Sequence, residues 1–267
     1  MKSPLRYPGG KSRLIKEILK FKPKDITEYR EPFLGGGSLF FHLLDDKEIE
    51  IFKASDTFPE LINFYQTMLQ SPQELVQVIE KMKMTNEPSK LFSFSKSLLA
   101  NKNSHSNIEQ AAAFFILNRT SFSGLTMSGG FSKASYDGRF KKPHIEKCGS
   151  LKNVKKQIQI KEASYEELLF QPTENKTWIF LDPPYDIKSS NLYGKNGDGH
   201  KGFDHEKLAI DCKNSQHQWL ITYNNNEHIR NLYEGWAFIQ EVDVVYNMNS
   251  SGKKRKELFI TNYKVDQ

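Results

Sequence analysis

An apolar run at residues 177–181 is followed directly by Asp182-Pro183-Pro184-Tyr185. The run has the composition of a buried parallel strand, and ligands of open α/β sheets collect where such strands end. Because two consecutive prolines restrict the backbone, we expect the Asp182 carboxylate and the Pro183 carbonyl to point toward one place. Two acceptors suit an amino group, which has two hydrogens to donate, and the Tyr185 ring can stack on a flat heterocycle. The tetrapeptide therefore predicts chemistry at the amino group of a base, against the alternative of a proline-rich turn after a buried strand.

A second group of residues fits a nucleoside-containing cofactor. The run GGGS begins at Gly35, between a predicted strand and a predicted helix, where glycine lets the backbone approach a ligand closely. Asp56 ends the next predicted strand, where a carboxylate can accept hydrogen bonds from ribose hydroxyls. The glycines lack the spacing of a dinucleotide site, and Phe33 precedes the turn, so a smaller adenosine-bearing ligand is favoured over NAD. The alternative is an ordinary turn followed by a strand-end aspartate.

The N-terminal segment RYPGGKS, residues 6–12, ends like a phosphate-binding loop. That loop requires a glycine five positions before its Gly-Lys pair, and Leu5 occupies this position. Pro8 has no N–H to offer to a phosphate, and no apolar strand precedes the segment. A nucleotide hydrolase is therefore disfavoured, and the simplest alternative is a surface turn before a helix at residues 11–21.

Alternating strand and helix patterns predict an α/β fold with a doubly wound, mostly parallel sheet. Strands are predicted at residues 25–33, 49–56, 176–185, 218–225, 237–246 and 256–263, and a short strand followed by a short helix at 157–169. Further helices are predicted at residues 11–21, 39–46, 58–69, 204–214 and 227–233.

The alternation stops between residues 71 and 149, where two helical stretches surround a region without clear pattern and precede a segment rich in serine and glycine. We predict a largely helical insertion at 71–149, and a core domain formed by residues 1–70 and 150–267. From Arg119 to Lys161 the chain has ten basic and two acidic residues. This density suits nucleic acid, and it also fits a solvated, lysine-rich surface.

The whole chain has 267 residues and a net charge of +6. Its hydrophobic content of 37% is enough for the packed core of one large domain. The two cysteines, Cys148 and Cys212, are far apart in the sequence. Neither a disulfide framework nor a structural metal site is therefore expected, and a cytoplasmic location is favoured. No apolar run is long enough to predict a membrane span.

Together these motifs resemble those of the Dam-type N6-adenine DNA methyltransferases. The matching segments are RYPGGKSRL, EPFLGGGSLFF, the strand-end Asp56, LNRTSFSGL in the insertion, LDPPY, and KELFITNY near the end of the chain. The resemblance extends over nearly the whole chain and is weakest at residues 71–105. It implies a Rossmann-like fold and S-adenosylmethionine as cofactor, in a pocket lined by Tyr7, Lys11, Phe33, Gly35, Asp56 and Asp182. Many relatives have tryptophan where Tyr7 stands.

The resemblance also implies that the insertion recognises double-stranded DNA. Candidates for contacts near the target base are Arg119, Phe122 and Ser123. Phe122 could wedge into the base stack, or it could pack in the protein core. Phosphate contacts are expected from a first basic group, formed by Lys133, Arg139, Lys141 and Lys142. A second basic group, formed by Lys253, Lys254 and Arg255, is either a further phosphate contact or a solvated hairpin loop.

The resulting prediction is a site-specific enzyme that turns one adenine out of the duplex and methylates its N6 amino group with the help of Asp182, Pro183, Pro184 and Tyr185. The nearest alternative is N4-cytosine or RNA amino-methylation, which uses the same chemistry. A non-catalytic DNA-binding module is an alternative of a different class. By resemblance the enzyme is expected to be a monomer, and a cognate restriction endonuclease is a conceivable partner.

Overall fold

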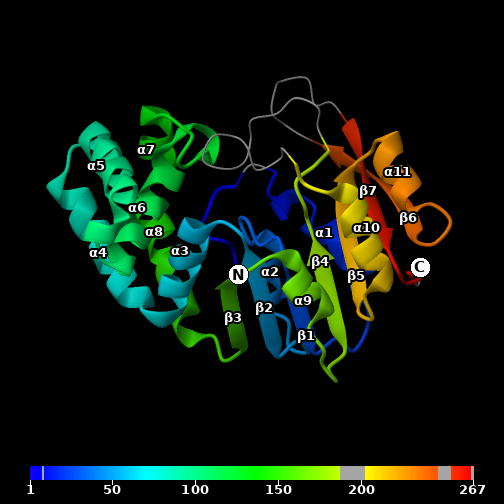
Figure 1. Ribbon diagram of the computed structural model, residues 1–267. Helices are drawn as coiled ribbons and strands as arrows, with labels where there is room; N and C mark the ends of the chain where they lie inside the picture. Colours follow the sequence, from blue (N-terminus) through cyan, green and yellow to red (C-terminus); the bar gives the residue numbers. More distant parts are fainter. Residues whose placement is uncertain (8, 187–201, 246–253, 266–267) are drawn as a thin grey trace.

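The computed structural model describes residues 1–7, 9–186, 202–245 and 254–265 (Figure 1). Its strands are β1 (Glu28–Glu31), β2 (Ile51–Asp56), β3 (Gln157–Glu162), β4 (Thr177–Leu181), β5 (Gln218–Asn224), β6 (Phe238–Val245) and β7 (Lys254–Thr261). Its α-helices are α1 (Ile15–Ile18), α2 (Ser38–Leu43), α3 (Pro59–Gln70), α4 (Pro72–Thr85), α5 (Pro88–Ala100), α6 (Asn107–Thr120), α7 (Lys133–Arg139), α8 (Lys142–Ile145), α9 (Tyr165–Phe170), α10 (His205–Asn214) and α11 (Glu227–Tyr233). Within these ranges no helix combines the length and the apolar character needed to cross a bilayer.

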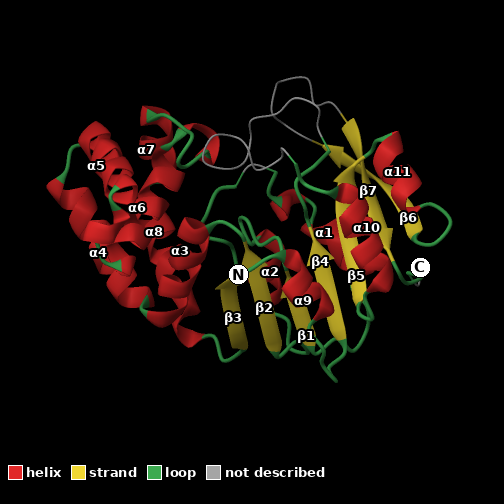
Figure 2. Cartoon of the chain, in the orientation of Figure 1, coloured by secondary structure: helices red, strands yellow, loops and turns green. Residues whose placement is uncertain are grey.

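The strands form one sheet in the order β3-β2-β1-β4-β5-β7-β6 (Figure 2). Neighbouring strands from β3 to β5 are parallel, and β7 runs antiparallel to both β5 and β6. The chain therefore starts in the middle of the sheet, proceeds outward to β3, and then returns to the other side of β1 as β4. The prediction of a doubly wound, mostly parallel sheet is confirmed.

Both faces of the sheet are covered, as the apolar composition of β4 predicted. Every residue of β4 is buried. Because side chains alternate along a strand, Trp178 and Phe180 belong to one hydrophobic cluster, whereas Ile179 and Leu181 belong to a second cluster that includes Leu208 of α10. The carboxyl end of β4 is thus held rigidly by packing on two sides.

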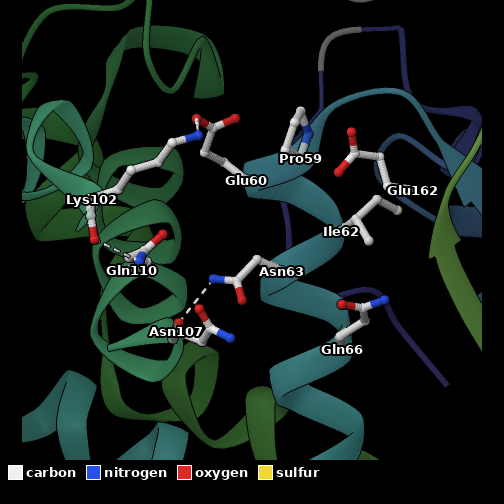
Figure 3. Close-up of a pocket in the computed structure, with 9 residues that line it drawn as sticks. All are labelled: Pro59, Glu60, Ile62, Asn63, Gln66, Lys102, Asn107, Gln110 and Glu162. Atoms are coloured by element: carbon white, nitrogen blue, oxygen red, sulfur yellow. Dashed lines mark hydrogen bonds and ion pairs between the residues drawn. The ribbon is translucent and has the colours of Figure 1, made fainter. Parts of the chain in front are cut away.

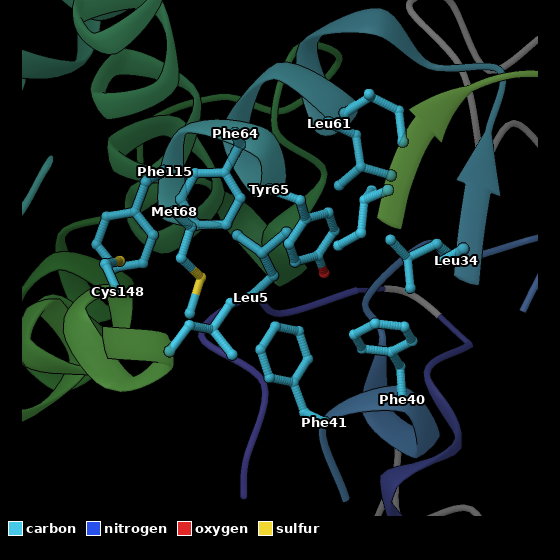
Figure 4. Packing of buried hydrophobic residues seen from close by; sticks show 14 of the residues in the cluster. Leu5, Leu34, Phe40, Phe41, Leu61, Phe64, Tyr65, Met68, Phe115 and Cys148 are labelled. Carbon is cyan, nitrogen blue, oxygen red and sulfur yellow. The ribbon is translucent and has the colours of Figure 1, made fainter. Parts of the chain in front are cut away.

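Residues 71–149 are mainly helical, and their helices lie beside the β3 edge of the sheet (Figure 1). Helix α6 is buried on every side from Ala111 to Thr120, because it packs against α3, α4 and α5 together. Phe64 of α3 stacks on Phe115 of α6, with ring centroids 5.8 Å apart and ring planes 9° apart (Figure 4). The same hydrophobic cluster continues from these rings to the sheet.

The predicted helix at residues 11–21 is interrupted. A 3-10 turn, η1 (Lys11–Arg13), precedes α1, and another, η2 (Leu19–Phe21), follows it. The N–H of Leu14 donates to the carbonyl of Lys11 at 2.8 Å, which is the tight i to i+3 bond of a 3-10 turn. The helical periodicity of residues 11–21 thus predicts a helical segment correctly, but it does not indicate the tighter 3-10 turn at Lys11.

The junction between α3 and α6 should contribute strongly to stability. Phe64 is fully buried, so Phe64→Ala should lower the free energy of unfolding by about 3–5 kcal/mol through lost burial and a cavity. Urea denaturation measures this change. Met84→Ala on α4, where the side chain is 87% exposed, is the control and should change stability by less than about 0.5 kcal/mol. Equal denaturation midpoints for the two variants would contradict a shared core.

Candidate functional site

Three carboxylates meet at one edge of the sheet. Glu31 ends β1, Asp56 ends β2, and Asp182 follows β4. The strands β2, β1 and β4 are parallel neighbours, so their carboxyl ends lie side by side. The chain reverses its winding direction between β1 and β4, and such a switch point is where open α/β sheets bind ligands.

The glycine turn and Asp56 are brought together as the sequence predicted. The Asp56 carboxylate accepts hydrogen bonds from the N–H groups of Gly35 at 2.9 Å and Phe58 at 3.1 Å. Gly35 has a φ of +44°, a conformation that favours glycine. Burial raises the pKa of Asp56, and these N–H bonds oppose the increase.

Tyr7 packs directly on the glycine turn. A Cβ atom added at Gly35 would lie 3.1 Å from Cε1 of Tyr7, and one added at Gly36 would lie 2.6 Å from its Cβ. The turn therefore needs glycine so that the N-terminal segment can approach it. Tyr7, Gly35 and Asp56, which the sequence assigned to one pocket, are neighbours in the structure.

Lys11 forms an ion pair with Asp182. Its ammonium lies 2.7 Å from Oδ1 and 2.8 Å from Oδ2 of the carboxylate, and it also donates to the carbonyl of Gly9 at 3.1 Å. Thr222 of β5 donates to Oδ1 of Asp182 at 3.0 Å. Lys11 is only 5% exposed, so a buried cation stands beside the carboxylate that the sequence placed at the centre of the chemistry.

Tyr185 is held at both its hydroxyl and its ring. The hydroxyl donates to the Glu257 carboxylate of β7 at 3.1 Å. The Lys11 ammonium lies 4.8 Å from the ring centroid, and the ring of Tyr223 lies 6.1 Å away. Sequence reasoning missed Thr222 and Glu257 as parts of the site. Glu257 lies within the segment KELFITNY, a signal that could have identified it.

Phe33 lies in an aromatic cluster. Its ring stacks on Tyr165, with centroids 5.5 Å and planes 23° apart, and meets Phe203 edge-on at 5.7 Å. Tyr165 begins α9, shortly after the end of β3. The sequence predicted Phe33 but not Tyr165, because only the sheet brings the ends of β1 and β3 to the same edge.

Glu31 has an unusual electrostatic environment. Burial, followed by the nearby carboxylates of Asp182 and Asp56, raises the pKa of Glu31 to about 8. Tyr29 donates a hydrogen bond of 2.6 Å to Glu31 and opposes this increase. The sheet edge therefore concentrates acidic groups in a low-dielectric place, which favours a cationic ligand.

Phe122 and Ser123 lie on a loop at residues 121–131, called the recognition loop below after the role that the sequence predicts for it. Its ends are joined by a bridge between Ser121 and Phe131, and Phe122 N–H donates to the Gly130 carbonyl at 3.1 Å. The Phe122 side chain is 65% exposed, so it does not pack in the core. Ser123 is also exposed, with a φ of +52°.

The Arg119 side chain is buried and bonded to the protein backbone. Its Nε donates to the carbonyl of Arg139 at 2.8 Å, and its Nη1 donates to the carbonyl of Pro4 at 3.3 Å. The side chain is 5% exposed, and burial, followed by repulsion from Arg6, lowers its pKa to about 10. We therefore correct its expected role from a DNA contact to a structural contact. The basic residue type pointed to DNA, whereas the depth of α6 in the core decides its position.

The first basic group is on the surface. Lys133, Arg139, Lys141 and Lys142 are all exposed, and Lys133 pairs with Asp137 at 3.0 Å. In the second basic group, Lys253 lies outside the described residues. Lys254 and Arg255 begin β7, but their side chains are outside the described part of the chain.

A pocket of about 370 Å³ lies between α3 and the start of α6 (Figure 3). Glu60 and Lys102 form an ion pair of 3.6 Å across it, and the Asn63 amide donates to the Asn107 carbonyl at 2.9 Å. No predicted site residue lines it. The lining residues are Pro59, Glu60, Ile62, Asn63, Gln66, Lys102, Asn107, Gln110 and Glu162.

Metal ligands and cysteine thiols are two further kinds of reactive group to consider among the described residues. Across those ranges, no group of three or more His, Cys, Asp or Glu side chains is arranged to hold a metal ion. Cys148 and Cys212 are buried, and burial raises the pKa of both thiols. A thiol in this state is a poor nucleophile.

The raised pKa of Glu31 predicts how stability depends on pH. The pKa of the Glu31 carboxyl is ordinarily 4.5, as in an unfolded chain, and about 8 in the folded protein. The folded protein therefore binds this proton more tightly than the unfolded chain does. The free energy of unfolding should therefore fall as the pH rises from about 5 to 8. Glu31→Gln should remove at least about 1 kcal/mol of this decrease, measured by urea denaturation across the range. Glu74→Gln, at an exposed position of α4, should follow the wild type, and identical pH profiles for all three proteins would contradict the assignment.

Comparison with known proteins agrees with this geometry. The model of the D12 class N6 adenine-specific DNA methyltransferases matches residues 7–248. The type II methyltransferase M.MjaIII of Methanocaldococcus jannaschii is 27% identical over 97% of this chain and 98% of its own length. M.CviBI of Paramecium bursaria Chlorella virus NC1A is 26% identical over 88% of both chains, and a DNA adenine methylase of Vibrio cholerae is 28% identical over 94% of this chain and 92% of its own. The chain therefore belongs to the D12 class of N6 adenine-specific DNA methyltransferases.

Proposed function

We propose that this DNA adenine methyltransferase acts on one adenine that is turned out of duplex DNA at a specific sequence, with the base held at Asp182, Pro183, Pro184 and Tyr185. The observation that carries the proposal is the position of this tetrapeptide. It follows β4 beside the glycine turn, with Asp182 fixed by Lys11 and Thr222. In this proposal the Asp182 carboxylate, the Pro183 carbonyl and the Tyr185 ring converge on the base next to the proposed cofactor pocket.

The acidic sheet edge supports the choice of S-adenosylmethionine, which carries a positively charged sulfonium. When bound, this cofactor supplies the methyl group. We propose that Asp56 binds its ribose, because that carboxylate ends β2 beside the glycine turn. The other proposed pocket residues are Tyr7, Lys11, Phe33, Gly35 and Asp182. Tyr165 is added because it stacks on Phe33.

The chain itself acts mainly by positioning and electrostatics. Asp182 and the Pro183 carbonyl accept hydrogen bonds from the 6-amino group, and Tyr185 stacks on the adenine. Both oxygens of Asp182 are held by the ammonium of Lys11, so in this proposal Asp182 serves as a positioned acceptor and need not be a strong base. The amino nitrogen becomes acidic only as it gains the methyl group, and in this proposal its proton then passes to solvent water.

We propose that the recognition loop faces the DNA. Phe122 is an exposed aromatic side chain that can enter the base stack, and Ser123 lies beside it. Lys133, Arg139, Lys141 and Lys142 would bind phosphates, which give affinity without sequence information. The name of M.MjaIII as a type II methyltransferase supports a role beside a cognate restriction endonuclease. The monomeric state and the cytoplasmic location stay predictions.

Expression in a bacterial host without DNA methylation tests the proposed function. Sequencing with modified-base detection should find N6-methyladenine within one short recurring sequence. Asp182→Ala should lower methyl transfer at least about 100-fold and still retard the DNA on a gel. Asp243→Ala, at an exposed position of β6, should transfer at the wild-type rate. Equal loss of DNA binding and transfer in Asp182→Ala would argue against its assigned role.

The bond between Tyr185 and Glu257 predicts a non-additive pair of variants. Tyr185→Phe keeps the ring and loses the hydroxyl, so kcat/KM should fall about 10- to 150-fold, the effect of losing a hydrogen bond to a charged group. Glu257→Ala should have a similar effect, and the double variant should be no worse than the poorer single variant. Glu257→Gln retains an acceptor for the tyrosine and should recover part of the rate. Multiplicative losses in the double variant would show that the two residues act separately.

A further inference from the structure

Two neighbouring side chains at the end of α6 bind the N-terminal segment of the chain. Arg119 donates to the carbonyl of Pro4 at 3.3 Å, and Asn118 bonds to the backbone of Arg6. Both belong to LNRTSFSGL, the segment that the sequence associated with DNA recognition, yet Asn118 is fully buried. Because both side chains are buried and bonded to the protein backbone, their contacts with the N-terminal segment need an explanation other than direct DNA contact.

The Asn118 amide forms hydrogen bonds both to the N-terminal segment and to the recognition loop. Its Oδ1 accepts from the Arg6 N–H at 2.8 Å, and its Nδ2 donates to the Arg6 carbonyl at 2.6 Å. The same Nδ2 lies 3.2 Å from Oγ1 of Thr126 and 3.4 Å from the Gly124 carbonyl, both in the recognition loop. An amide nitrogen has two hydrogens, which these three acceptors share. A displacement of the loop therefore alters the bond to Arg6.

The recognition loop also touches Arg6 directly. Gly124 has a φ of +77°, and a Cβ atom there would lie 3.0 Å from both the Cβ and the carbonyl oxygen of Arg6. Thr126 donates to the Gly124 carbonyl at 3.1 Å and through its N–H to Oγ of Ser121 at 3.1 Å. The loop is thus bonded within itself and contacts Arg6 as a unit.

Arg6 leads directly into the proposed active site. The next residue, Tyr7, packs on the glycine turn, and its carbonyl accepts from the Gly10 N–H at 3.1 Å. Lys11 follows and pairs with Asp182. Lys11 is only five positions after Arg6 in the sequence, so the contact of Arg6 with the loop and the contact of Lys11 with Asp182 are close together along the chain.

We propose that Asn118 is a positioning residue that couples DNA recognition by the recognition loop to the cofactor pocket and Asp182, through Arg6, Tyr7 and Lys11. The inference rests on the proposed function. By linkage, DNA binding then raises the affinity for cofactor, and cofactor raises the affinity for DNA by the same factor.

Calorimetry of the full chain with S-adenosylhomocysteine tests this coupling. Titrations are made without DNA and with a saturating synthetic duplex that carries the sequence identified by the expression experiment. The ratio of the two dissociation constants is the coupling factor, which should be about fivefold or more for the wild type. Asn118→Ala should reduce it to less than about twofold, because Arg6 loses both hydrogen bonds to Asn118 and keeps only its packing contact with the loop at Gly124. A wild-type factor of one, or an unchanged factor in Asn118→Ala, would overturn the proposal.

Matched variants separate coupling from damage to the fold. Asn63→Ala removes a different bond from an asparagine to the backbone, between α3 and the Asn107 carbonyl of α6, and should keep the wild-type factor. Since the loss of a buried amide can unfold a protein, Thr126→Ala is the second test. It removes the bond between Asn118 and the Thr126 hydroxyl, together with the bond from that hydroxyl to the Gly124 carbonyl, and leaves both bonds from Asn118 to Arg6 in place. It should lower the factor, and Thr126→Ser should restore it. A wild-type factor in Thr126→Ala, or an equal loss in Asn63→Ala, would refute the coupling.

The same wild-type preparation is assayed for methyl transfer to the same duplex. If the wild type transfers methyl groups and the variants keep its coupling factor, only the coupling is refuted. If the wild type transfers none, the proposed function fails and this inference fails with it.

Discussion

The ion pair between Lys11 and Asp182 connects the two ends of the candidate site. The two residues are 171 positions apart in the sequence, and both carboxylate oxygens lie within 2.8 Å of the same ammonium. Burying such a pair costs desolvation energy, which the bonds from Lys11 to Gly9 and from Thr222 to Asp182 partly offset. The N-terminal segment has little regular secondary structure, so its position depends on tertiary contacts, which include this pair, the contact of Tyr7 with the glycine turn and the bonds from α6.

The parallel sheet creates the need for that cation. Because β2, β1 and β4 are adjacent, Asp56, Glu31 and Asp182 end at one edge, where burial and mutual repulsion penalise their charges. The raised pKa of Glu31 is a consequence of this burial and repulsion. A positively charged ligand relieves it, and so does Lys11. The close carboxylates at this edge raise the energy of the protein without a ligand. For the same reason they make the edge a suitable place for a positively charged sulfonium.

The helical segment is joined to this edge through the protein interior as well as along the chain. Phe64 and Phe115 carry the core from α3 into α6, and the end of α6 binds the N-terminal segment through Asn118 and Arg119. The recognition loop is therefore supported by a buried helix instead of a flexible linker. In the proposed mechanism, this support would hold the exposed Phe122 in a defined position while the base is turned out of the duplex.

The sequence by itself determined the order of the elements, the doubly wound sheet, and the two motifs at the ends of β1 and β4, because apolar periodicity, glycine and proline act locally. It did not reveal which distant residues complete the site. Glu257 reaches Tyr185 only because β7 inserts between β5 and β6, and Tyr165 reaches Phe33 only across the sheet edge. Arg119 has the charge of a DNA contact, but the depth of α6 in the core turned it inward. Such placements depend on strand order and helix burial, which arise from contacts between residues far apart in the chain, and only the tertiary structure decides them.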